Sequence, residues 1–446
     1  MEQHALYQRE NVWSVFREAL PPVMLAQLIL ALYNLVDSFF IGRFSGEGLT
    51  ALSAIFPLQL LVTALAVGTG VGVNTLAAHY YGRSLRDQAE QSAGSGVVLA
   101  FLSWLPTALF GLFLMEPFAR LCTNSPQAAA YTVEYGRIVC VGSLPVFLEG
   151  VWSKVHQARG NMRLPTAAQI AGALTNLLLD PLLIFGPGPL PALGVAGAAI
   201  ATVLGQAVAA AITASAFHQP PAPAAFFRLS RQIYRLGYPS ILMQSLYTVY
   251  ILGLNLILTG FGDEAVTALG LYYKLQTFFF IPLFGLETCI VPYLSFVHAG
   301  GNTRRCRDIM SAAALVCAVF MAVAAAFFLL IPGPMIRLFT PDSRVLAIGI
   351  PAFRIIALSF LPGVFSLLSP VFFQAIGAPV RSSFLSVLRQ LLCLVPIFWL
   401  LSRFGLFWAW FSFPLSEILT GAAGWFLYRR QLARWGISQK ETFILP

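Results

Sequence analysis

Two aspartates stand inside long apolar runs of this sequence, where an ionisable side chain is costly. Asp180 lies in NLLLDPLLIF and Asp37 lies in ALYNLVDSFFIG. A carboxylate at the middle of a bilayer costs roughly 3 kcal/mol or more, so an acid within a membrane span is by default a functional candidate. Asn176 precedes Asp180 by four residues and Asn34 precedes Asp37 by three. Each pair therefore shares one helix face, and the spacing predicts polar faces within apolar helices.

Two kinds of chemistry suit these groups. A buried carboxylate beside a second carboxylate can take up a proton near neutral pH, because burial and like charge both favour the neutral form. Oxygen-bearing side chains can instead coordinate a hard cation such as Na⁺. The candidates for this cation-coupling site are Asp37, Asn176, Asp180 and Thr202. The sequence does not separate the two roles, and a structural polar cluster that fixes helix packing is the alternative.

Further residues in the apolar runs are candidates for conformational change or substrate contact. Pro181 removes a backbone donor directly after Asp180, so we expect a loosened or kinked helix there. The acids Glu287 and Glu417 lie in later apolar runs, where either can contact a cationic substrate. Two amides, Asn34 and Gln206, are further candidates for substrate contact.

The composition identifies the setting of these residues. The chain has 446 residues, of which 58% are hydrophobic and 10% charged, whereas soluble domains carry about 25% charged residues. We therefore predict an all-α integral membrane protein, since apolar runs of about 20 residues span as helices. The twelve expected spans are 20–42, 49–81, 92–115, 131–157, 164–186, 193–217, 236–260, 266–298, 311–332, 345–375, 380–402 and 405–428.

The net charge of +9 reports membrane topology. In a twelve-span chain most basic residues fall on one side of the membrane, and this positive-inside bias places both termini in the cytoplasm. These residues are Arg83, Arg86, Lys154, Arg159, Arg163, Arg228, Arg231, Arg235, Arg304, Arg305, Arg307, Arg429, Arg430, Arg434 and Lys440. We therefore expect the lipid bilayer, and no nucleic acid, as the macromolecular partner.

The sequence matches itself when it is shifted by 217 residues. Thirteen of the 47 ungapped positions from 22 to 68 are identical to their counterparts. Six spans per copy is an even number, so both copies enter the membrane in the same sense and are related by an axis along its normal. We predict two pseudo-symmetric six-helix lobes, residues 1–217 and 236–446, joined by a cytoplasmic linker at 218–235. Such an architecture is typical of an alternating-access transporter.

The same shift distinguishes the two aspartates from the shared scaffold. Asp37 aligns with Leu254, and Asp180 aligns with Ile397. The acids therefore belong to the N-terminal copy alone, which favours a coupling role over an architectural one. The five histidines and six cysteines show no metal-type or redox-type spacing. We predict no catalytic residue, no enzyme activity and no cofactor other than the coupling ion, H⁺ or Na⁺.

Several segments together resemble the MATE (multidrug and toxic compound extrusion) family, in its DinF/MepA-like branch. They are PPVMLAQLILALYNLVDSFFIGRFSGEGLTALSAIFPL, GTGVGVNTLAAHYYGR, NLLLDPLLIFG and GVAGAAIATVLGQ. The resemblance covers about residues 15 to 430. It implies two lobes around a V-shaped cavity and the export of amphipathic, often cationic compounds by antiport with H⁺ or Na⁺. It also implies an N-lobe cation site at Asp37, Asn176, Asp180 and Thr202, and a bend of the first span at Pro22.

The chain departs from one branch of that family, and other classes remain open. The NorM-like branch carries a glutamate in its seventh helix, whereas the run 236–260 contains no acid. The alternative function is that of a lipid-linked saccharide flippase of the same superfamily, for which Arg389 and Lys274 are candidate contacts. A major-facilitator-type transporter and a membrane-embedded protein without transport activity are weaker alternatives. We expect a monomeric multi-pass protein of the cell (plasma or inner) membrane that binds small amphipathic or cationic substrates.

Overall fold

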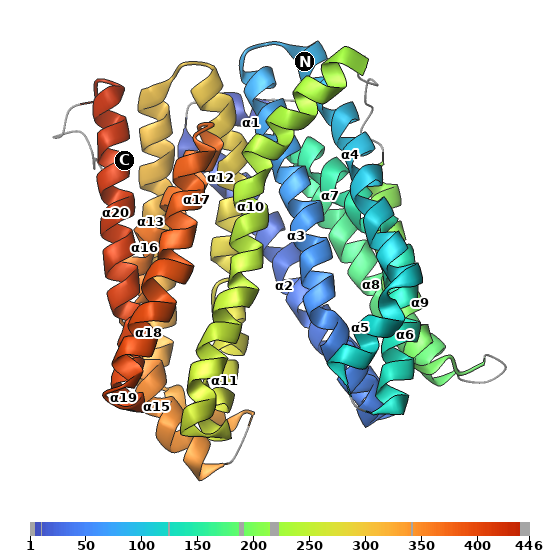
Figure 1. Ribbon diagram of the computed structural model, residues 1–446. Coiled ribbons are helices and arrows are strands. Elements are labelled where there is room, and N and C mark those ends of the chain that lie inside the picture. Colours follow the sequence, from blue (N-terminus) through green and yellow to red (C-terminus); the bar gives the residue numbers. More distant parts are fainter. Residues whose placement is uncertain are drawn as a thin grey trace. The chain divides into compact units, whose positions relative to one another are not determined.

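The computed structural model of the protein describes residues 5–9, 11–123, 125–186, 191–214, 223–339 and 342–437, and these fold into helices joined by short turns (Figure 1). The side chains at 5, 33–39, 42, 46, 49, 50, 53, 223, 224 and 263 lie outside this description. The helices are α1 (Ala5–Gln8), α2 (Val12–Phe44), α3 (Gly46–Gly82), α4 (Arg86–Phe113), α5 (Met115–Cys122), α6 (Pro126–Val141), α7 (Leu144–Ala158), α8 (Arg163–Phe185), α9 (Gly194–Thr213), α10 (Pro223–Leu258), η1 (Thr259–Phe261), α11 (Asp263–Phe279), α12 (Ile281–Ala299), α13 (Thr303–Leu330), α14 (Pro332–Arg337), α15 (Ser343–Ala357), α16 (Phe360–Ala375), α17 (Pro379–Val387), η2 (Leu388–Leu394), α18 (Val395–Ser402), α19 (Leu406–Ala409) and α20 (Ser412–Arg434).

The all-helical prediction is confirmed, and much of the helix is apolar enough to cross a membrane. Within the described residues nine helical segments pass a length and hydropathy test for spanning, and two bent helix pairs raise the number to eleven if each pair is one span. The pairs are α6 with α7, bent by 42°, and α15 with α16, bent by 59°. Because α6–α7 and α15–α16 correspond at the 217-residue shift, the bend recurs at the same place in both copies.

Two of the expected spans differ in the structure. The expected span 266–298 is divided at Phe280 into α11 and α12, of which α12 passes the spanning test. The expected span 405–428 corresponds mainly to α20, which carries Glu417 and has three arginines near its end. α20 does not pass the spanning test. The twelve-span count and the cytoplasmic termini therefore stay predictions.

The described chain divides into two compact units. The N-terminal unit comprises Met1–Gln8 and Pro21–Ile241, and the C-terminal unit comprises Arg9–Leu20 and Leu242–Pro446. The start of α2 thus groups with the C-terminal unit, where the Arg305 guanidinium donates to the backbone carbonyl of Arg9. The sequence analysis assigned these residues to the first lobe, because nothing local in the sequence indicates such a long-range contact.

The segment expected as a linker is helical in its described part. α10 runs without interruption from Pro223 to Leu258 and appears in Figure 1 as one long ribbon. A proline at the first helical position suits a helix start, because its ring fixes φ and its missing N–H has no intrahelical partner there. The first part of α10 packs on α3, where a Cβ added to Gly72 would lie 2.2 Å from the Ile233 carbonyl oxygen. This packing explains why residues 223–235 continue the helix instead of forming a separate linker.

In the N-terminal unit, α8 and α9 cross with their backbones in close approach. A Cβ added to Gly205 would lie 2.6 Å from the Gly172 carbonyl oxygen, and one added to Gly172 would lie 2.7 Å from the Gly205 carbonyl oxygen. Small residues permit this approach, as they do at many helix crossings in membranes. Asn176 lies one turn beyond Gly172, so the crossing brings polar side chains of the two helices within reach of each other.

A buried ion pair ties α3, α4 and α7 together in the same unit. Arg159 contacts both carboxylate oxygens of Glu90, at 2.8 and 2.7 Å, and its Nε donates to the Tyr81 hydroxyl at 3.1 Å. The Tyr81 hydroxyl in turn donates to Glu90 at 2.8 Å. Because each charged group in this cluster is partnered, the contacts offset the desolvation cost of burying the pair, and loss of one partner would leave the other charge uncompensated.

The start of α3 is fixed by a cap outside the spanning segments. The Ser45 hydroxyl accepts from the Gly48 N–H at 3.2 Å and donates to Glu47 at 2.8 Å. This hydrogen bond lowers the pKa of Glu47 from its usual value. The acid in the first turn also suits the positive end of the helix dipole.

In the C-terminal unit, α16 packs against α12, α13, α17 and α20. Next to it the helix that follows α17 widens into the π-helix η2, which carries Arg389 and Gln390. Aromatic rings fill the interior, including Tyr272 with its edge-on contacts to Phe328, Phe353 and Phe413. Single π-turns occur frequently at functional sites, so η2 is a candidate position for one.

The crossing of α8 and α9 makes a testable prediction about stability. Gly205→Ala forces a methyl group against the Gly172 carbonyl, and overpacking of this kind costs about 1–3 kcal/mol. We expect a lower thermal unfolding midpoint for the purified protein in detergent. Gly270→Ala is the matched control, because no atom lies within 4 Å of its added Cβ. A midpoint for Gly205→Ala equal to that of the control would contradict the close crossing.

Candidate functional site

Three of the four predicted cation-site residues lie together in the N-terminal unit. Asp180 and Asn176 come from α8, and Thr202 comes from α9. Asp180 is fully buried, and the other two are 3% and 5% exposed. The Asn176 amide nitrogen lies 3.3 Å from Asp180 Oδ1 and 3.3 Å from Thr202 Oγ1. The tight crossing of the two helices therefore assembles a polar cluster inside an apolar unit.

The Asn176 amide has a second orientation that satisfies both of its polar atoms better. With oxygen and nitrogen exchanged, the NH₂ group donates to Asp180 Oδ2 at 3.2 Å, and the amide oxygen accepts from the Thr202 backbone N–H at 3.1 Å. The assignment of an amide follows from its hydrogen bonds, and we adopt this orientation. The Thr202 hydroxyl is then not needed by Asn176.

The fourth residue of the predicted set is Asp37. It belongs to α2, but its side chain and that of Asn34 lie outside the described side chains. Among the described side chains, no group of three His, Cys, Asp or Glu residues is positioned to hold a metal ion. Within the part that the structure describes, the predicted cation site combines the Asp180 carboxylate with the amide of Asn176 and the hydroxyl of Thr202. Such a mixed oxygen set suits a hard monovalent cation as well as a proton.

The two prolines predicted to act in conformational change lie inside continuous helices. Pro181 is within α8, and Pro22 is within α2 beside Pro21. α8 continues through Pro181 to Phe185, so the expected loosening does not end the helix. The missing N–H still leaves the Leu177 carbonyl without its usual helical donor, one turn from the Asp180 carboxylate.

Gln206 lies one turn after Thr202 on α9. Its side-chain oxygen is buried and has no hydrogen-bond partner within the described residues. A buried amide oxygen without a donor costs roughly 1–3 kcal/mol. Its position beside the cluster makes Gln206 a candidate to contact a bound group, as the sequence predicted.

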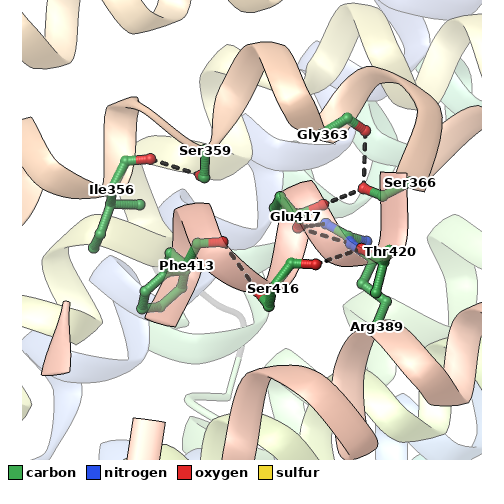
Figure 2. Close-up of polar contacts among 9 residues, drawn as sticks. All are labelled: Ile356, Ser359, Gly363, Ser366, Arg389, Phe413, Ser416, Glu417 and Thr420. Carbon is green, nitrogen blue, oxygen red and sulfur yellow. Dashed lines mark hydrogen bonds and ion pairs between the residues drawn. The ribbon is translucent and has the colours of Figure 1, made fainter. Parts of the chain in front are cut away.

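Glu417, in the C-terminal unit, is held by an arginine (Figure 2). Arg389 donates to Glu417 Oε1 from Nε at 2.8 Å, and its terminal nitrogen lies at 2.8 Å from the same oxygen. The Ser366 hydroxyl donates to Glu417 Oε2. The sequence analysis proposed Glu417 for contact with a cation, but it did not predict this ion pair. The two residues are 28 positions apart, on different helices, and no spacing in the sequence relates them.

Glu287 lies on α12, within electrostatic range of Arg389. Lys274, the other basic residue considered for a flippase, is exposed on α11. Arg389 thus lies near two of the acids that the sequence analysis selected, and it neutralises one of them by direct contact. The C-terminal unit thus pairs an acid directly with an arginine, whereas Asp180 in the N-terminal cluster has the Asn176 amide among its partners.

The polar cluster at α8 and α9 makes a testable prediction. Asn176→Ala removes the donor to Asp180 and the acceptor from the Thr202 N–H, which costs about 1–3 kcal/mol in a buried site. Thr202→Val removes a hydroxyl that the adopted amide orientation does not use, so we expect a loss below about 1 kcal/mol. Thermal unfolding midpoints of the two variants measure the difference. An equal loss in both would assign the other amide orientation.

Comparisons with known proteins relate the whole chain to membrane transporters. It is 26% identical over 444 residues to a protein of Shewanella oneidensis named FAD transporter, covering 96% of this chain and 97% of the relative. It is 22% identical to the multidrug export protein MepA of Staphylococcus haemolyticus, covering 96% and 95%. Its fold matches that of a MOP-superfamily transporter from Pyrococcus furiosus with a TM-score of 0.89, at 21% identity and covering 98% and 99% of the two chains.

A family model gives the most direct assignment. The MatE model matches residues 22–182 and matches again at 239–400. The two matches begin 217 residues apart, which is the shift that aligns the sequence with itself. Together they cover more than half of the sequence. The chain therefore belongs to the MATE family, whose members are membrane transporters and not enzymes.

Proposed function

We propose that this protein exports amphipathic, often cationic compounds by antiport with H⁺ or Na⁺, through alternating access. The coupling site of this proposal is Asp37, Asn176, Asp180 and Thr202. The observation that carries it is the fully buried Asp180 beside Asn176, across a helix crossing from Thr202. The name of the MepA relative, a multidrug export protein, supports the substrate class.

The physical argument rests on the charge of Asp180. An ionised carboxylate out of water needs a compensating positive charge or several donors, and the Asn176 amide is one such donor to Asp180. A proton or a sodium ion supplies the compensation directly. Binding of that ion changes the electrostatic energy of the site by an amount that can favour one conformation over another. Such an ion-dependent change in electrostatic energy is what ion coupling requires of a site.

The remaining parts of the proposal concern the setting. We propose that the protein works as a monomer in the plasma or inner membrane, with the coupling ion in place of a cofactor. Pro22 and Pro181 lie within helices where a missing backbone hydrogen bond lowers the cost of bending. Bending at these points is the proposed response to ion binding.

A second candidate function has a specific observation in its favour. The Shewanella relative, aligned over 96% of this chain, is named FAD transporter. FAD is an amphipathic dinucleotide with a negative charge, and Arg389 supplies a positive group in the C-terminal unit. Export of an anionic nucleotide is therefore the alternative, and it is compatible with the same coupling site.

The coupling site is tested by Asp180→Asn and Asp37→Asn in reconstituted vesicles. Each change keeps the size of the side chain and removes the ionisable group. We expect gradient-driven ethidium efflux to fall by about tenfold or more, since coupling energies are typically 1–3 kcal/mol. Asp87→Asn is the matched control, because Asp87 is exposed in the first turn of α4. Exchange at the wild-type rate in both site variants would refute the proposal.

The identity of the ion is tested by running the assay with a pH gradient without Na⁺, and with a Na⁺ gradient at constant pH. Thr202→Val separates the two roles. The hydroxyl is a ligand for Na⁺ but is not needed to protonate a carboxylate, so the variant is expected to lower Na⁺-driven efflux and to leave H⁺-driven efflux intact. FAD in place of ethidium tests the second candidate in the same vesicles.

A further inference from the structure

A small cavity lies beside η2 in the C-terminal unit. Its volume is about 30 Å³, and η2, α10, α11, α16 and α20 contribute to its wall. A water molecule occupies about 10–15 Å³ on this measure, so the cavity has room for roughly two water-sized atoms. The lining residues that carry the argument are Arg389, Gln390, Glu417, Tyr250, Tyr272 and Tyr273.

The charges at the cavity are balanced and partly exposed. The Arg389 side chain is 22% exposed and that of Glu417 is 13% exposed, and both line the cavity. The contacts to Glu417 use two of the five N–H donors that a guanidinium presents. Removing Glu417 from Arg389 without a substitute would leave the guanidinium uncompensated, so a ligand that takes the place of Glu417 has to be an anion.

One further group at the cavity needs a partner. Gln390 is 5% exposed, and its side-chain oxygen has no hydrogen-bond partner within the described part of the chain. It follows Arg389 directly, and both side chains line the cavity. A buried amide oxygen without a donor is costly, so this position favours a ligand that brings an N–H or O–H group.

We propose that this cavity binds an anionic group, a carboxylate or a phosphate, which replaces Glu417 as the partner of Arg389. Two oxygens of the group fit the volume of the cavity, and a planar guanidinium suits bidentate contact with them. An N–H or O–H of the same ligand donates to Gln390. Tyr250, Tyr272 and Tyr273 line the same cavity, and the displaced Glu417 keeps its hydrogen bond from Ser366.

The same geometry disfavours a cation here. A cation that approaches Glu417 meets Arg389, which already neutralises this carboxylate at 2.8 Å. Glu417 acts instead as an internal competitor that keeps Arg389 partnered when no solute is bound. The inference rests on the proposed transport function only in that the ligand is a transported solute. Binding is measured at equilibrium and without a gradient, so either proposal can fail alone.

The experiment compares two probes that differ by one anionic group. Flavin mononucleotide carries a phosphate, and riboflavin is the same flavin without it. We expect the wild-type protein in phosphatidylcholine nanodiscs to bind the nucleotide at least about tenfold more tightly by fluorescence titration. Arg389→Gln is expected to abolish this preference, and Glu417→Gln to strengthen nucleotide binding severalfold by removing the competitor. Equal binding of both probes by the wild type, or a preference that survives Arg389→Gln, would overturn the proposal.

Three controls keep the test decisive. Arg381 lies on the preceding helix α17, donates to the Gln431 side chain at 2.6 Å and does not line the cavity. The variant Arg381→Gln is therefore expected to keep the preference for the nucleotide. Arg389→Lys retains the positive charge and is expected to keep part of the preference for the nucleotide. If Arg389→Gln does not fold, the double variant Arg389→Gln/Glu417→Gln removes both charges together and is expected to show no preference.

The source of the anion is tested by the lipid. Nanodiscs that contain phosphatidylglycerol are expected to leave nucleotide binding unchanged if the site takes a soluble solute. If phosphatidylglycerol instead weakens nucleotide binding to the wild type but not to Arg389→Gln, and leaves riboflavin binding unchanged, the site takes an anionic lipid headgroup. Weaker nucleotide binding in Glu417→Gln than in the wild type would show that Glu417 assists binding, and it would overturn the displacement.

Discussion

A carboxylate removed from water must be compensated where it lies, and this constraint shapes both units of the protein. In the N-terminal unit Asp180 is fully buried and accepts a hydrogen bond from the Asn176 amide. In the C-terminal unit Glu417 meets a full positive charge and a hydroxyl. Each acid has such partners because an uncompensated charge in the membrane interior costs several kcal/mol.

The helix packing follows from the need to bring compensating groups close. α8 and α9 approach until glycine backbones touch at Gly172 and Gly205, and this places Asn176 against Thr202. A bulkier residue at the crossing would separate the amide from the Thr202 backbone N–H that it needs. In the C-terminal unit the wider turn of η2 carries Arg389 to the carboxylate on α20. Small residues in one unit and an irregular turn in the other thus both bring a partner close to a buried carboxylate.

Much of the architecture could be predicted because it depends on local sequence patterns. Apolar runs predicted the helices, and the four-residue spacing of Asn176 and Asp180 predicted that both lie on one helix face, where their side chains are in contact. The bend between α6 and α7 recurs between α15 and α16 at the same 217-residue shift, although no bend was predicted there from the sequence. These features depend on residues that are close in the chain or that are repeated in it.

What could not be predicted depends on contacts between distant residues. Glu417 was selected as an acid in an apolar run, but its neutralisation by Arg389 depends on how η2 and α20 pack. The helical start of α10 depends on the surface of α3, and the grouping of Arg9–Leu20 with the C-terminal unit depends on Arg305. In each case the local sequence is compatible with more than one outcome, and tertiary packing selects among them.

The two modes of compensation have different consequences for ligands. A buried carboxylate that accepts from an amide gains from a bound cation, because the ion supplies positive charge that an amide does not. A carboxylate paired with arginine gains little from a cation, because the arginine already neutralises it. The proposed coupling cation and the proposed anionic solute group are thus assigned to different units of the protein. The shared scaffold of the two repeats does not require this difference, so it is a property of the particular residues that each copy places in its apolar helices.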